Sequence, residues 1–295
     1  MPSPTLPTPA MDDFELQGSI QNLFVYPIKS CAGVAVNEAI LTETGLEFDR
    51  AWMVVDAAGE FVTQRELPRM CLVQPTLKHF EMVLRAPGML ALHIALDSVE
   101  QPCRASVWGH ACAAYDMGDI AAQWFTDFLA KKVRLVRFDP EHQRPSSAQW
   151  TGGVLALNQF SDGYPVLVIS SAALDGLNER LAQQGHSPVT MQRFRPNIVL
   201  AGCEAHDEDR TQALHIATDG GAVEFGLVKP CPRCPMPNVN PQTAVPSPEV
   251  GDTLQGYRQD ARLDGAVSFG MNAITLQGFD QVLRVGQRVG ANYTF

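Results

Sequence analysis

The chain has 295 residues, an apolar content of 45%, a charged content of 18% and a formal net charge of −10. This length suffices for two domains with separate cores, and the acidic balance argues against a general nucleic-acid binder or a binder of anionic membranes. No run approaches the ~18 consecutive apolar residues of a spanning helix and the N-terminus lacks a signal pattern, so we expect no membrane association and a cytoplasmic location.

The first half of the chain is predicted to consist mostly of short strands. Residues 1–17 are rich in Pro, Ser and Thr and then acidic, which predicts a disordered tail. After residue 18, short apolar runs alternate with turn residues, a pattern typical of β strands. We expect strands over residues 20–28, 34–41, 51–55, 61–64, 71–77 and 89–96.

Helices are expected at two places only. An apolar stripe at helical spacing predicts a helix over 119–129, with Asp119 as N-cap, followed by a strand over 133–138. The turn-rich residues 139–153 predict a domain boundary. The second half is expected to hold a helix over 172–184 among strands over 166–169, 196–200, 222–228, 273–276 and 282–289. The sequence therefore predicts a mainly β chain with a few helices (α+β), in two β-rich units over 18–140 and 141–295.

The run from Lys229 to Pro235 carries two thiols, Cys231 and Cys234, three residues apart among prolines. Proline fixes φ and lacks an N–H, so this run predicts a stiff loop and excludes a helix. A thiolate is stabilised beside a cationic side chain, so Cys234, next to Arg233, is a candidate metal ligand or reactive sulfur.

The cysteine pair by itself leaves several roles open. A structural zinc site needs four ligands, and no second CxxC or HxxxH motif follows. A thioredoxin-like redox pair would stand at the start of a helix, which the prolines prevent. Of the other cysteines, Cys71, Cys103 and Cys112 lie in strand-like apolar runs, and we interpret them as buried and inert.

Basic segments also stand at three expected strand ends. They are Lys29-Ser30, Asp49-Arg50, and the run from Arg193 to Asn197. The guanidinium of an arginine binds an oxyanion through two parallel hydrogen bonds. The amide of an asparagine can both donate to and accept from the heteroatoms at the edge of a ligand. In an acidic chain, these segments and the cysteine-bearing loop together predict a positive pocket for an anionic ligand.

Five motifs, in this order, resemble those of the MOSC family, the molybdenum cofactor sulfurase C-terminal domain with its N-terminal β-barrel domain. They are Tyr26-Pro27-Ile28-Lys29-Ser30-Cys31, Asp49-Arg50, Gln64-Arg65-Glu66-Leu67-Pro68-Arg69, Phe194-Arg195-Pro196-Asn197, and Cys231-Pro232-Arg233-Cys234 followed by Val239-Asn240-Pro241. The pattern is similar to that of the mitochondrial amidoxime-reducing components and their bacterial counterparts. The resemblance implies a β-barrel-like MOSC domain packed against an N-terminal β-rich domain.

The resemblance also implies the cofactor and its contacts. The cofactor is Mo-molybdopterin, and the family's molybdenum ligand corresponds to Cys234, the expected metal-binding and catalytic residue. A soft thiolate suits such a sulfur-rich metal centre. The residues assigned to the phosphate and pterin are Lys29, Ser30, Arg50, Arg195, Asn197 and Arg233. Tyr164 stands in a Gly163-Tyr164 pair where relatives have Thr-Ser, and Asn272 stands where the amidoxime-reducing enzymes have tyrosine.

The activity implied by the resemblance is the reduction of small N-hydroxylated or N-oxygenated compounds by oxygen-atom transfer. Electrons would come from a separate donor protein of the ferredoxin, flavodoxin or cytochrome type, since the chain has no Cys-rich ferredoxin tail. The alternative is a non-catalytic carrier of the molybdenum cofactor or of sulfur, the latter as a persulfide on Cys231 or Cys234. A third interpretation is a structural protein whose cysteine pair has no chemical role.

Overall fold

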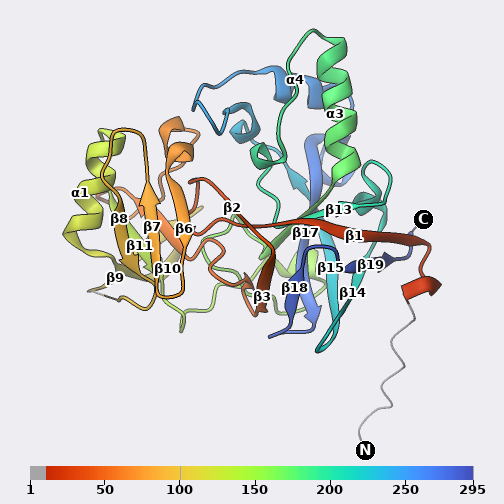
Figure 1. The fold of residues 1–295 in the computed structure, drawn as a ribbon, viewed down its shortest axis with the longest axis horizontal. Coiled ribbons are helices and arrows are strands. Elements are labelled where there is room, and N and C mark those ends of the chain that lie inside the picture. Colours follow the sequence, from red (N-terminus) through yellow and green to blue (C-terminus); the bar gives the residue numbers. More distant parts are fainter. Residues whose placement is uncertain (1–10, 100, 295) are drawn as a thin grey trace, which may run out of the picture.

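The computed structural model describes residues 11–99 and 101–294. Two β-rich parts lie next to each other, one beside helix α1 (Gly118–Leu129) and the other below helices α3 (Ser171–Gln183) and α4 (Glu249–Gln255) (Figure 1). The mainly β fold with a few helices and a barrel-like domain is thereby confirmed.

The larger part is a closed barrel of seven strands. In order around the barrel they are β12 (Val166–Ser170), β13 (Ile198–Ala201), β1 (Leu16–Val25), β19 (Arg288–Ala291), β14 (Ala213–Thr218), β15 (Gly221–Pro232) and β17 (Ala266–Gln277). Pairing of β12 with β17 closes the circle, and closure removes the unpaired edges of a sheet. The barrel interior is apolar, with Leu23, Ile198 and Phe225 in one fully buried cluster.

The outer face of the barrel is covered where α3 and α4 pack on it. Successive side chains of a strand point to opposite faces, so Leu23 of β1 packs inside the barrel while Phe24 packs in the outer cluster. Ala173, Leu177 and Leu181 recur every four residues on α3 and are its buried residues. The short helix α2 (Ala148–Thr151) lies in the segment before β12.

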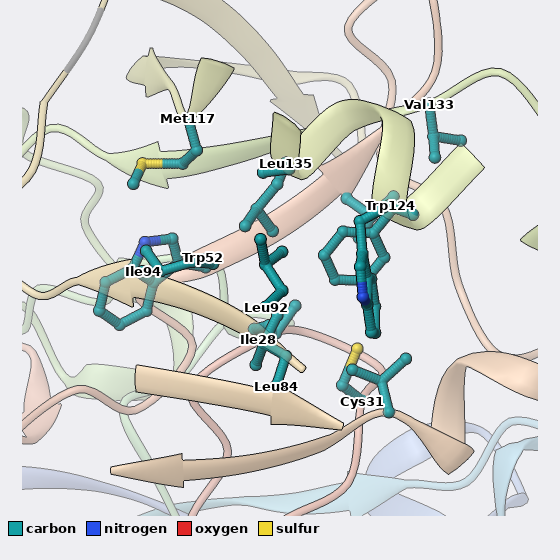
Figure 2. Packing of buried hydrophobic residues seen from close by; sticks show 14 of the residues in the cluster. Ile28, Cys31, Trp52, Leu84, Leu92, Ile94, Met117, Trp124, Val133 and Leu135 are labelled. Atoms are coloured by element: carbon teal, nitrogen blue, oxygen red, sulfur yellow. The ribbon is translucent and has the colours of Figure 1, made fainter. Parts of the chain in front are cut away.

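The second part has two sheets with α1 against one of them. One sheet contains β5 (Trp52–Val55), β11 (Arg134–Phe138), β10 (His110–Asp116) and β9 (Gln101–Val107); the other contains β6 (Gln74–Leu77), β7 (Glu81–Arg85) and β8 (Leu92–Ala95). Figure 2 shows their shared core, in which Trp124 of α1 lies near Leu135 of β11 and Leu92 of β8. Trp124 also donates its indole N–H to the carbonyl oxygen of Leu90 at 2.8 Å, which satisfies its polar atom.

Smaller elements complete the described residues. The strands are β2 (Val34–Val36), β3 (Glu38–Thr42), β4 (Gly45–Leu46), β16 (Gln259–Asp260) and β18 (Val282–Arg284), and the 3₁₀ helices span Met11–Asp13, Pro68–Leu72, Met191–Arg193, Asp207–Arg210, Met236–Asn238 and Ala261–Leu263. In residues 11–99 and 101–294, no helix has the length and apolar character needed to cross a bilayer.

Several details differ from the sequence-based expectation. Helix α1 begins at Gly118 after Met117, so Asp119 is not its N-cap; instead Asp116 Oδ1 accepts the Gly118 N–H at 2.8 Å. The expected strand over 61–64 is only a single bridge at Phe61, and the expected strand over 71–77 begins with a 3₁₀ turn that contains Cys71. Strands β7, β9 and β10 were not predicted, because charged and small residues obscure the alternation of apolar and polar side chains in their sequences.

The predicted disordered tail is wrong for its last seven residues. Residues 11–13 form a 3₁₀ turn, Phe14 is buried and stacks on His215, and β1 starts at Leu16. Residues 1–10 lie outside the described part. The division into domains over 18–140 and 141–295 stays a prediction, and the structure adds that β1 is a strand of the barrel formed by the second of them.

Candidate functional site

Residues from both parts of the molecule line one pocket. It is lined by all nine residues for which the sequence predicts cofactor contacts: Lys29, Ser30, Arg50, Tyr164, Arg195, Asn197, Arg233, Cys234 and Asn272. Their role as cofactor contacts stays a prediction, but the fold brings every one of them to the same place. Asp162 and Arg193 also line the pocket, although the sequence did not predict a cofactor contact for either of them.

Strand ends position these side chains at one end of the barrel. β1 is antiparallel to β13, so Lys29 and Ser30 beyond the end of β1 come close to Arg195 before the start of β13. β12 is parallel to β13 and starts at the same end, just after Tyr164. Asn272 of β17 lies opposite Lys229 of β15, shortly before that strand ends at Pro232. The strand pairing of the barrel therefore explains why motifs far apart in the chain meet.

The backbone is left-handed at three of these residues. Ser30 has φ 67°, Arg50 has φ 51° and Arg195 has φ 58°. For a residue with a Cβ this conformation costs about 1–2 kcal/mol, so the surrounding structure must hold it in place. Hydrogen bonds do so at the domain junction, where Lys29 N donates to Trp52 O at 2.8 Å and Arg50 N donates to Tyr26 O at 2.8 Å.

Two arginines lie against the same buried ring, that of Tyr26. Their guanidinium carbons are 4.2 Å (Arg50) and 4.3 Å (Arg195) from its centroid. Arg50 pairs with Asp49 at 2.5 Å and donates to Arg195 O at 3.0 Å, while Arg195 donates to Cys31 O at 2.6 Å. Burial, and then the charge of Arg50, lower the pKa of Arg195. An anion bound here would relieve this repulsion.

Asn197 is almost fully buried and its amide is engaged within the protein. Its Oδ1 accepts hydrogen bonds from Arg50 Nη1 at 3.2 Å and Leu167 N at 3.1 Å, and its Nδ2 donates to Phe24 O at 3.2 Å. Asn197 therefore orients Arg50 and ties β1 to β12, which is a positioning role at the pocket wall.

Lys29 is buried and reaches the pocket from the N-terminal part. Its Nζ lies 2.6 Å from Asp162 Oδ1 and 2.8 Å from Phe160 O. Burial lowers the pKa of Lys29, although Asp162 opposes this shift. Desolvation by the surrounding protein would raise the pKa of the Asp162 carboxyl, but the charge of Lys29 and the hydrogen bonds from Lys29 and Trp108 together outweigh it and hold that pKa below its usual range.

Arg233 and Arg193 add two more guanidinium groups, both anchored to backbone carbonyls. Arg233 donates to Phe269 O and, at 3.0 Å, to Phe194 O, and Arg193 donates to Pro237 O at 3.0 Å. These bonds tie the segments around the pocket to one another. Arg193 begins the run from Arg193 to Asn197, one of the segments from which the sequence predicts a positive pocket, and the structure places it there.

The two cysteines of the pair are not equivalent in the structure. Cys231 lies within β15 and is partly buried, and burial raises the pKa of its thiol. Cys234 lies beyond the strand end and is exposed at the pocket. The predicted loop is therefore partly strand, because Pro230 and Pro232 are accommodated at irregularities of the β15–β17 pairing. Within the described chain, no three His, Cys, Asp or Glu residues gather as metal ligands, as the zinc interpretation would require.

Family models match both parts of the chain. The model of the MOSC N-terminal beta barrel domain covers residues 17–132, and that of the MOSC domain covers residues 157–290. The chain belongs to the MOSC family.

Individual MOSC relatives make the comparison more specific. The chain is 38% identical over 253 residues to mitochondrial amidoxime reducing component 2 of Rattus norvegicus, covering 82% of the chain and 72% of the relative. It is 36% identical over 253 residues to mitochondrial amidoxime-reducing component 1 of Homo sapiens, with the same coverage of 82% and 72%. Molybdenum cofactor sulfurase of Bos taurus is 30% identical over 261 residues, which are 81% of the chain and 29% of that protein. These relatives support a function associated with the molybdenum cofactor.

The MOSC pocket fits the anionic, hydrogen-bonding part of such a cofactor. Ser30 Oγ, Arg195 Nη2 and Tyr164 OH are buried and have no hydrogen-bond partner among the described residues. A buried polar atom without a partner is costly, so these three are suited to a ligand that supplies acceptors. Burial also raises the pKa of Tyr164 to about 12, so its hydroxyl stays a donor at neutral pH.

Gly33 packs against the Tyr26 ring, on which the guanidinium groups of Arg50 and Arg195 lie. A Cβ at residue 33 would lie 2.4 Å from Cε1 of Tyr26, whose ring is fully buried. We expect Gly33→Ala to lower the free energy of unfolding by about 1–3 kcal/mol through overpacking, and to weaken phosphate binding because Tyr26 must shift. Thermal unfolding with and without phosphate measures both effects. Gly176→Ala on α3, where φ is not positive and a Cβ would meet only the flexible Arg180 side chain at 3.4 Å, is the control for glycine loss. Wild-type phosphate binding in Gly33→Ala would contradict the expectation.

Proposed function

We propose that this protein is a molybdenum-cofactor-dependent reductase of N-hydroxylated compounds. The observation that carries the proposal is the position of Cys234, an exposed thiol at a pocket whose buried wall offers basic groups and unpartnered donors. The identity of 36–38% to amidoxime-reducing components supports the choice of substrate class.

Different residues of the pocket would bind different parts of the cofactor. Ser30 and Arg195 would bind the phosphate through their unpartnered atoms, with Arg50 held beside them by Asp49 and Asn197. Cys234 would supply the thiolate ligand of the metal. When bound, the cofactor would supply the two-electron chemistry that removes oxygen from an N–O group.

The overall reduction needs a supply of electrons. Breaking the N–O bond consumes two electrons and two protons and releases water and the reduced nitrogen compound. We infer that a separate donor protein of the ferredoxin, flavodoxin or cytochrome type delivers the electrons. The cytoplasmic location expected from the sequence stays a prediction.

The direct test combines metal analysis with an activity assay. We expect stoichiometric molybdenum and pterin in the purified protein, and reduction of benzamidoxime to benzamidine with a reduced electron donor. A protein with full molybdenum and pterin content that is inert toward amidoximes and hydroxylamines would reject the catalytic proposal.

The second candidate is a carrier of sulfur or of the cofactor. It is favoured by the similarity to molybdenum cofactor sulfurase and by the exposure of Cys234. Mass spectrometry of the intact protein separates the candidates, since a persulfide adds the mass of one sulfur atom to a cysteine. That adduct in protein free of metal would support the carrier.

A further inference from the structure

Asp162 is the one carboxylate among the described residues that line the pocket. Its side chain is 64% exposed, whereas Lys29, Ser30, Arg195 and Asn197 are buried. The pocket is therefore divided, with basic groups on its buried wall and Asp162 and Cys234 on its solvent side. A resident cofactor belongs with the buried groups, and a substrate that exchanges with solvent meets the exposed ones.

The carboxylate of Asp162 is held in one orientation by two neighbours. Oδ1 accepts hydrogen bonds from Lys29 Nζ at 2.6 Å and from the indole N–H of Trp108 at 3.1 Å. Trp108 is itself held by Phe61, 5.0 Å between ring centroids, and by the guanidinium of Arg65 at 4.7 Å. Both hydrogen bonds use Oδ1, so Oδ2 remains available on the exposed side of the group.

We propose that Asp162 Oδ2 accepts hydrogen bonds from the N–H and O–H donors of the substrate and thereby selects amidoxime-type compounds. This inference rests on the proposed function. The charged groups of the pocket wall other than Asp162 are donors: Lys29, Arg50, Arg193, Arg195 and Arg233. A substrate rich in donors therefore needs the acceptor that Asp162 provides.

The chemistry of the substrate and the product matches this carboxylate. An amidoxime presents an amino group and a hydroxyl as donors, and its reduced product is an amidinium cation at neutral pH. Because Oδ1 is already used by Lys29 and Trp108, the carboxylate binds the amidinium through Oδ2, which accepts an N–H hydrogen bond strengthened by the opposite charges. An aromatic N-oxide, in contrast, has no N–H or O–H donor and gains nothing from Asp162.

The substitution Asp162→Asn tests substrate recognition while keeping a hydrogen-bond acceptor for Lys29. Asparagine retains one carbonyl oxygen for Lys29 and Trp108 and places an amide N–H₂ where Oδ2 was, so a hydrogen-bond acceptor becomes a donor. We expect the KM for benzamidoxime to rise at least about tenfold and the KM for pyridine N-oxide to change less than about twofold, because a hydrogen bond to a charged group is lost only for the first substrate. Asp175→Asn, an exposed charge loss on α3, is the control.

A binding measurement complements the kinetics. Calorimetric titration of the cofactor-loaded protein with benzamidine should show affinity at least about tenfold weaker in Asp162→Asn than in the wild type. Equal benzamidine affinity, or an equal loss for both substrates with lowered molybdenum content, would overturn the role of Asp162. A wild-type protein inert toward both substrates would instead overturn the proposed function, and the benzamidine titration would still decide the role of Asp162.

Discussion

Cys234→Ala is expected to yield purified protein without molybdenum and without reductase activity, whereas Cys231→Ala retains both. Cys234 is the exposed sulfur at the pocket and has no structural partner that its loss would disrupt among the described residues. Removing a group that only orients a metal-binding side chain lowers metal affinity about 10–100-fold. Removing the metal-binding side chain itself should therefore lower the affinity more than about a hundredfold. Cys231 lies on β15 with a thiol whose pKa is raised by burial, which disfavours the thiolate a metal needs.

The measurement is molybdenum and pterin content of each variant beside the wild type, followed by the benzamidoxime assay. Thermal unfolding of the cofactor-free proteins provides the folding control, and Cys234→Ala should unfold at the wild-type temperature because residue 234 is exposed. Retention of molybdenum by Cys234→Ala, or its loss from Cys231→Ala alone, would show that the ligand has been assigned to the wrong sulfur.

The convergence of the site was predictable because each motif stands at a strand end. Lys29 follows β1 and Arg195 precedes β13, and the antiparallel pairing of these two strands brings both residues to one end of the barrel. Arg50, which precedes β5 of the neighbouring sheet, joins them through the hydrogen bond from its N–H to Tyr26 O. Short strands with clear alternation, such as β1, are visible in the sequence. What periodicity does not reveal is which strands pair, and so the place of β1 between β13 and β19 was not foreseen.

The contacts that orient the site were not predictable from the sequence. Asp162 is joined to Lys29 across 133 positions and Asn197 to Arg50 across 147, and no local pattern encodes such pairs. The strand character of Cys231 was missed for another reason. Prolines usually end a strand, yet β15 continues through Pro232 because its register against β17 shifts near each proline.

The position of the pocket between two parts of the chain has a functional consequence. The N-terminal part contributes Lys29, Ser30 and Arg50, and the barrel contributes Arg195, Cys234 and the segment that holds Asp162. Neither part presents the complete set, so the proposed cofactor binding would depend on the contacts between them, such as the hydrogen bonds from Arg195 to Cys31 O and from Arg50 to Arg195 O. Ligand binding to a site of this kind stabilises the assembled fold over states in which the junction opens.

Arg195→Met should strongly reduce this ligand stabilisation while leaving the cofactor-free fold intact. Arg195 is buried beside Arg50, carries an unpartnered Nη2 and has a lowered pKa because of burial and the neighbouring charge. Replacing a buried charge with an apolar side chain of similar volume is often neutral, so the loss of the bond to Cys31 O should be offset to within about 1 kcal/mol. Phosphate binding, however, should weaken about ten- to hundredfold, since about 1.5–3 kcal/mol accompanies each lost charge-assisted hydrogen bond.

Arg195→Lys tests whether charge alone suffices. Lysine keeps the positive charge but lacks the planar fork that reaches Cys31 O and an anion at the same time, so we expect it to bind phosphate weakly, between the wild type and Arg195→Met. Unfolding temperatures of the cofactor-free proteins are compared in phosphate and in sodium chloride of equal ionic strength, with Arg104→Met, a surface arginine outside the pocket, as the matched control. A phosphate-dependent rise in Arg195→Met equal to that of the wild type would mean that the anion binds elsewhere. Full binding by Arg195→Lys would mean that the charge, rather than the fork, governs the site.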